Sequence, residues 1–251
     1  MNEVVQGFVL TGFIAFCRVG ACFMIMPGLS SARVPLQVRL FAAIAATGGL
    51  AVHMWDQIFP FVRPDPATLA PMILSELMIG CLLGIMARIY VLAFQFIAAS
   101  VTMVIGYGAP QGGAAVEDNE QQAPLAAIIS FGALMLMFVF NFHHEIIRAL
   151  VESYRIAPVN VFFNAQAALV DVTDTLSEAF MVVLRLGSPF IAYGLLVNLT
   201  IGFVNKLTPQ IPIYFISLPF VIAGGLILVY FGVPSMLSLF ADGFADISLS
   251  R

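Results

Sequence analysis

The chain has 251 residues, of which 61% are hydrophobic and only 10% are charged. Soluble domains carry about 25% charged residues, so this composition excludes an ordinary soluble domain and predicts a protein inserted in, or assembled at, a membrane. The formal net charge is −4 and Lys206 is the only lysine, so no basic patch is available to neutralise the phosphates of a nucleic acid.

The first two apolar runs cover residues 4–26 and 36–54. The first is long enough to span the roughly 30 Å of a bilayer core, and it carries Arg18 near its middle. An arginine inside an apolar helix is costly and usually faces protein or water. We therefore expect Arg18 to have a partner on another helix or another chain.

The third run, residues 69–105, is unusually long. As one helix it would extend about 55 Å at 1.5 Å per residue, well beyond a bilayer core. It either folds back near Arg88 or forms one long helix that does not simply cross a membrane. Glu76 and Arg88 would be buried charges in both cases, and an ion pair that sets helix register is favoured for them over a transport role.

A polar, glycine-rich segment at 106–124 interrupts the apolar pattern. Its glycines allow positive φ angles, so no regular helix is expected to cross it. Its backbone cannot face lipid, so it lies in water as a plain connection or it lines or fills a cavity inside protein. Its candidate residues are Gly106, Tyr107, Gly108, Pro110, Gly112, Gly113, Val116, Glu117, Asp118, Glu120 and Pro124.

Residues 125–142 form another apolar block, followed by a charged stretch. Glu145, Arg148, Glu152 and Arg155 recur every three or four residues, which predicts the polar face of one helix. The histidines that precede this stretch lack the spacing that places two of them on one helical face, and the cysteines lie in apolar runs. No metal or cofactor site is predicted.

The C-terminal part is predicted to be a hairpin of two long helices. Residues 160–174 form a polar helical candidate that runs into 180–204, where Arg185 is an isolated charge and Pro189 should kink the helix. Pro209, Gln210 and Pro212 mark a rigid reversal. The last apolar run, 213–231, is followed by an acidic tail.

The predicted fold class is therefore all-α, with long, kinked, apolar helical hairpins that belong to a membrane-associated hetero-oligomer. Four charges within apolar runs, Arg18, Glu76, Arg88 and Arg185, are expected to be buried and to support assembly. Their scatter suits a subunit whose apolar surface meets other protein better than a bundle surrounded by lipid.

A set of residues in fixed order extends over nearly the whole chain. It consists of Arg18, Pro27, Arg33, Pro35, Arg39, Glu76, Gly80, Gly84, Gln95, Gly106, His143 or His144, Ser153, Pro158, Pro189, Asn198, Pro209, Gln210, Ile213, Tyr214 and Phe215. No single motif is specific, but the ordered set and the chain length resemble the FliR family of flagellar biosynthetic proteins, which is related to the SctT, SpaR and YscT proteins of injectisomes. The stretch 117–124 departs from the family pattern by being longer and more acidic.

The resemblance implies a non-catalytic core subunit of the type III export gate, in the bacterial inner membrane at the flagellar basal body. It implies assembly with FliP and FliQ, association with FlhB, a position near FlhA, and unfolded flagellar proteins as the exported substrate. Residues 1–158 would be FliP-like and residues 159–251 would form a FliQ-like helical hairpin. The segment 106–124 would plug the pore.

Two other function classes compete with this one. A secondary transporter or ion channel could use the buried arginines and glutamate, but the two halves of the sequence show no evident inverted repeat. An intramembrane enzyme lacks support, because the apolar runs hold no paired catalytic carboxylates and no zinc-protease motif.

Overall fold

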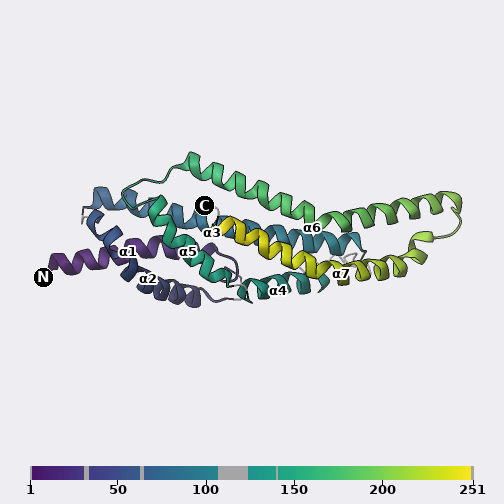
Figure 1. Ribbon diagram of the computed structural model, residues 1–251, viewed down its shortest axis with the longest axis horizontal. Coiled ribbons are helices and arrows are strands. Elements are labelled where there is room, and N and C mark those ends of the chain that lie inside the picture. Colours follow the sequence, from purple (N-terminus) through teal and green to yellow (C-terminus); the bar gives the residue numbers. More distant parts are fainter. Residues whose placement is uncertain (1, 31–33, 63–64, 107–123, 140, 250–251) are drawn as a thin grey trace. The chain divides into compact units, whose positions relative to one another are not determined.

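The computed structural model describes the chain except for residues 1, 31–33, 63–64, 107–123, 140 and 250–251. All regular structure in the described residues is helical, which confirms the all-α class. In chain order the elements are α1 (Asn2–Ile25), α2 (Leu36–Ile58), the short 3₁₀ helix η1 (Phe59–Phe61), α3 (Pro66–Val104), α4 (Pro124–Val139), α5 (Phe142–Ile156), α6 (Ala165–Leu207) and α7 (Ile213–Leu249) (Figure 1).

These helices form two compact units that are interleaved along the chain. Unit one holds Met1–Val91 and Asn141–Ser177, and unit two holds Leu92–Phe140 and Glu178–Arg251. The helices α3 and α6 each contribute residues to both units. The predicted division at Pro158 rests on likeness to FliP and FliQ and stays a prediction.

The long third run forms one helix. α3 continues for 39 residues through Arg88 without folding back, which decides between the two possibilities left open by the sequence. Its length is about twice the 20 or so residues that cross a bilayer core.

The C-terminal hairpin begins later than predicted, and its second helix extends beyond the last apolar run. α6 begins at Ala165 and not at residue 160, because the Asn164 side-chain oxygen accepts hydrogen bonds from the backbone N–H groups of Gln166 (3.0 Å) and Ala167 (3.3 Å) and caps the helix. The predicted acidic stretch after residue 231 belongs to α7, which remains helical to Leu249.

Pro189 lies inside α6, which is assigned as one helix from Ala165 to Leu207, and the kink there stays a prediction. A proline lacks the N–H that would bond the carbonyl four residues earlier, here that of Arg185. The hydroxyl of Ser188 donates to this carbonyl at 3.0 Å instead.

Unit one is built around α1. Ile14 and Ala15 pack with Met54 and Ile58 of α2 and with Tyr154 of α5. One turn further along α1, Val19, Cys22 and Phe23 pack with Ala43 of α2 and with Ile146 and Leu150 of α5. Half of the residues in the apolar part of α1 are buried, a larger share than in any of the other four long apolar helices of the described chain.

Two glycines bring α3 against α1. A Cβ atom on Gly80 would overlap the backbone carbonyl oxygen of Arg18 and would lie 3.0 Å from the Cβ of Ala21. A Cβ atom on Gly84 would lie 2.9 Å from the Cβ of Ile25. Only glycine allows two helix backbones to approach this closely, so the face of α3 that carries Gly80 and Gly84 is the face that contacts α1.

Five helices of the described residues are long and apolar enough to cross a membrane. They are Val5–Ile25, Leu36–Phe61, Pro66–Val104, Ala165–Leu207 and Ile213–Ser238. Large apolar side chains remain exposed on α2, α6 and α7, among them Val52 (81%), Leu207 (80%) and Phe215 (76%). Surfaces of this kind are covered by lipid or by other protein.

The contact at Gly80 gives the first testable prediction. Replacing Gly80 with alanine places a methyl group against rigid backbone, and we expect a loss of stability of about 1–3 kcal/mol, as for other overpacked sites. Gly48→Ala is the matched control, because a Cβ atom there meets no neighbour within 4 Å, and it should be neutral or stabilising by up to about 1 kcal/mol. Thermal unfolding of the detergent-solubilised full chain measures both, and equal midpoints for the two variants would contradict the close contact.

Candidate functional site

A fully buried arginine marks the centre of unit one. Arg18 is 0% exposed and Glu76 on α3 is 1% exposed. The glycine contact explains how they meet, since Gly80 lies one helical turn beyond Glu76 and touches the backbone of Arg18 itself. The same close approach of α3 to α1 therefore brings the two charges together.

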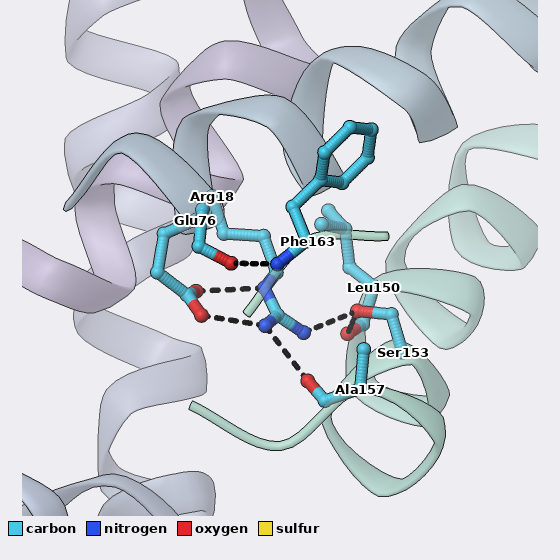
Figure 2. A network of polar contacts seen from close by, with 7 residues as sticks. Arg18, Glu76, Leu150, Ser153, Ala157 and Phe163 are labelled. Carbon is cyan, nitrogen blue, oxygen red and sulfur yellow. Dashed lines mark hydrogen bonds and ion pairs between the residues drawn. The ribbon is translucent and has the colours of Figure 1, made fainter. Parts of the chain in front are cut away.

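The two side chains form a two-pronged ion pair (Figure 2). The Arg18 Nε–H donates to Glu76 Oε2 at 2.7 Å and the Nη2–H donates to Oε1 at 2.6 Å. The planar guanidinium fork matches the two carboxylate oxygens, and such charge-assisted pairs are among the stronger hydrogen bonds in proteins. Each charge is neutralised where water is absent.

The remaining donors of Arg18 reach α5 and the residue that follows it. Nη1–H donates to the Ser153 hydroxyl at 3.0 Å and Nη2–H donates to the backbone carbonyl of Ala157 at 2.9 Å. The Tyr154 ring lies 3.7 Å from the guanidinium carbon, in a cation–π contact. One side chain thus ties α1 to α3 and α5.

A neighbouring hydrogen bond fixes the connection between α5 and α6. The Ser75 hydroxyl accepts from the backbone N–H of Phe163 at 2.8 Å. Ser75 and Glu76 are consecutive residues of α3. Ser75 binds Phe163 near the end of this connection directly, and Glu76 holds Ala157 at its start through Arg18 (Figure 2).

The phenol of Tyr154 remains neutral in this cluster. Burial raises the pKa of the Tyr154 hydroxyl above its ordinary value of about 10, and the nearby Glu76 carboxylate raises it further. The hydroxyl lies near that carboxylate but has no hydrogen-bond partner of good geometry among the described residues. The ring contributes through its contact with Arg18.

The opposite face of α5 carries the charges that the sequence places there. Arg148 pairs with Glu145 at 3.5 Å and Arg155 pairs with Glu152 at 3.2 Å, and both arginines are about two-thirds exposed. Pairs in water contribute little to stability. These two exposed pairs confirm the predicted polar face of α5, and they contrast with the buried pair of Arg18 and Glu76.

Two of the four charges, Arg18 and Glu76, are buried within the chain itself, whereas burial of Arg88 and Arg185 against partner chains stays a prediction. Arg88 and Arg185 are exposed on this chain, and neither forms an ion pair among the residues that the structure describes. Each lies on an outward face of a long helix, whereas Arg18 lies on the most enclosed helix. A sequence pattern shows that a charge sits in an apolar run but not which way its helix is turned.

The predicted central segment is described only at its two ends. Gly106, two residues after the end of α3, has a left-handed backbone with φ of 75°, and Pro124 is the first residue of α4. Tyr107, Gly108, Pro110, Gly112, Gly113, Val116, Glu117, Asp118 and Glu120 lie outside the described residues. At the predicted reversal, Pro209, Gln210 and Pro212 lie between α6 and α7.

The sequence did not predict Ser75, Ser153, Tyr154 or the Ala157 carbonyl as part of the cluster around Arg18. A signal for Tyr154 was present, because Phe142, Ile146, Leu150 and Tyr154 recur every four residues and form the buried stripe of α5. No pattern in the sequence points to a backbone carbonyl as a partner of Arg18.

Fold and cluster define an all-helical protein with membrane-type helices and a closed internal charge cluster. Comparison with known proteins identifies the family. The family model described as "Bacterial export proteins, family 1" matches residues 9–247. The chain therefore belongs to this family of bacterial export proteins, which confirms the predicted membership of the FliR family.

Individual relatives match over most of their length. The flagellar biosynthetic protein FliR of Caulobacter vibrioides is 26% identical over 98% of both chains. FliR of Aquifex aeolicus is 23% identical over 96% of this chain and 92% of its own. The Yop proteins translocation protein T of Yersinia pestis is 23% identical over 91% of this chain and 88% of its own.

The buried pair gives the second prediction. Arg18→Leu or Glu76→Leu leaves one charge buried without its partner, which costs about 3–5 kcal/mol, so little chain should be recovered in folded form. The double variant leaves no unpaired charge and should be recovered better than either single variant. Arg155→Ala, on the exposed face of α5, is the control and should stay within about 0.5 kcal/mol of the parent. Yield and thermal midpoint in detergent measure these effects, and single variants that match Arg155→Ala would show that the pair does not hold unit one together.

Proposed function

We propose that the chain is a non-catalytic subunit of a bacterial type III export gate. The observation that carries this proposal is the family match over residues 9–247, together with relatives named for flagellar biosynthesis and for Yop protein translocation. The exposed apolar faces of α2, α6 and α7 support it further, since they suit a subunit that is covered by partners.

The proposed partners are FliP and FliQ in one hetero-oligomeric gate, with FlhB associated and FlhA nearby. The proposed location is the bacterial inner membrane at the flagellar basal body, where unfolded flagellar proteins are exported. Residues 1–158 correspond to a FliP-like part and 159–251 to a FliQ-like hairpin in this proposal.

The geometry of the charge cluster favours a structural role over transport. Arg18 and Glu76 are closed to water, and four of the five guanidinium N–H groups are already engaged. A transported ion or proton needs a water-accessible path to such a group. The cluster instead suits a fixed register among α1, α3 and α5, and a secondary transporter or channel that uses these charges is disfavoured.

We further propose that the segment 106–124 plugs the export pore. A plug must block ions yet move aside for a substrate, which suits weak and reversible contacts. The glycines of this segment make its backbone permissive. Glu117, Asp118 and Glu120 lie close in sequence, and their repulsion would lower the cost of opening.

Deleting residues 112–120 is the third prediction. The shortened chain should still enter the complex, because the deletion spares every contact of units one and two described above. The membrane should then become leaky to small ions, measured as dissipation of the membrane potential in cells that assemble the gate.

The Arg155→Ala chain is the control for this deletion and should remain tight. Native mass of the purified complex shows whether the deleted chain has assembled. A membrane that stays tight around a fully assembled complex with the deletion would exclude the plug.

A further inference from the structure

The C-terminal end of α3 is enclosed by α6 and α7 within unit two. Val101 and Thr102 are buried and Ile105 is 0% exposed. Val104 touches α6 at Gly194, and Ile105 touches α7 at Gly225. Val104, the last residue of α3, and Ile105, which follows it, therefore contact the two helices of the hairpin. We call these four residues, Val104, Ile105, Gly194 and Gly225, the α3-end contact.

Neither glycine of the α3-end contact has room for a side chain. A Cβ atom on Gly194 would overlap Cγ1 of Val104, and a Cβ atom on Gly225 would overlap the Cβ of Ile105. Glycine within a helix costs about 1 kcal/mol relative to alanine, so close packing accounts for its presence here. In contrast, a Cβ atom on Gly202, on the same helix as Gly194, meets no neighbour within 4 Å.

A hydrogen bond joins the two helices of the hairpin next to the α3-end contact. The Tyr193 hydroxyl donates to the backbone carbonyl of Val221 at 2.7 Å, which ties α6 to α7. A Cβ atom on Gly224 would lie 2.6 Å from that hydroxyl oxygen. Tyr193 precedes Gly194 and Gly224 precedes Gly225, so the residues that join the two helices adjoin those that hold α3.

The chain leaves α3 immediately beyond this contact. Gly106 donates its N–H to the Met103 carbonyl at 3.1 Å and turns into the left-handed region with φ of 75°. A Cβ atom on it would lie 3.5 Å from Leu218 and 4.0 Å from Ile222, both on α7. Gly106, where the chain leaves α3, therefore also packs against α7.

We propose that Gly194 and Gly225 are positioning residues that hold the end of α3 in the α6–α7 hairpin and so fix where the chain enters the central segment. This proposal rests on the proposed function, because the position of that entry matters only if the segment acts in the gate. It assigns the hairpin a task in addition to forming part of the channel wall, namely supporting the helix that precedes the central segment.

The first test of this proposal, and the fourth prediction, is a rescue experiment. Gly194→Ala should raise the ion leak of the assembled gate several-fold, or lower the yield of complex if the end of α3 is displaced further. Val104→Ala removes the atom that the new methyl group would overlap, so the double variant should restore both readouts towards the parent. Gly202→Ala is the control on the same helix and should behave as the parent. A Gly194→Ala chain that matches Gly202→Ala, or one that Val104→Ala does not rescue, would overturn the proposal.

The second test uses a disulfide and needs no leak measurement. A Cβ atom on Gly194 would lie 3.5 Å from the Cβ of Val104, within the range of about 3.5–4.5 Å that disulfides use. The Val104→Cys, Gly194→Cys chain should cross-link on mild oxidation, and mass spectrometry separates this link from the native cysteines. The Val104→Cys, Gly202→Cys chain should not cross-link. Absence of the first link in the assembled complex would overturn the α3-end contact itself, whereas a tight gate after deletion of residues 112–120 would overturn the plug and leave that contact without a role in gating.

Discussion

Arg18 places a full positive charge inside α1, the most enclosed of the long apolar helices that the structure describes, and the packing of unit one depends on how that charge is compensated. Glu76 neutralises it through two short hydrogen bonds, while Ser153 and the Ala157 carbonyl take further donors. A buried pair of this kind adds little net stability over apolar packing, but losing either partner is costly. Its effect is therefore to permit one arrangement of α1, α3 and α5 and to penalise others.

Glycines provide the close approaches on which both units rely. In unit one, Gly80 and Gly84 let α3 reach α1 at the level of the ion pair. In unit two, Gly194 and Gly225 let the end of the same helix enter the α6–α7 hairpin. Helices with apolar surfaces all round gain little specificity from hydrophobicity alone. Small residues at the contacts and one buried pair supply that specificity here.

The sequence allowed the helices to be predicted better than their contacts. Apolar length and proline or glycine breaks located the runs that became α1 to α4, because these signals are local. The start of α6 was predicted too early because Asn164, and not Asn160, supplies the cap. The exposure of Arg88 and Arg185 could not be predicted, because the direction a helix faces is decided by packing between distant segments. The resemblance to the FliR family, in contrast, was recognisable from an ordered set of residues, and the family comparison confirms it.

The most direct test of the account is the native mass of the complex that this chain forms. The chain is co-expressed with its FliP and FliQ counterparts and purified through a tag on this chain alone. The account predicts a large hetero-oligomer that contains one copy of this chain, with the exposed apolar faces of α2, α6 and α7 protected from modification in the complex. A stable monomer or homo-oligomer that leaves those partners unbound would contradict the assignment as an export-gate subunit.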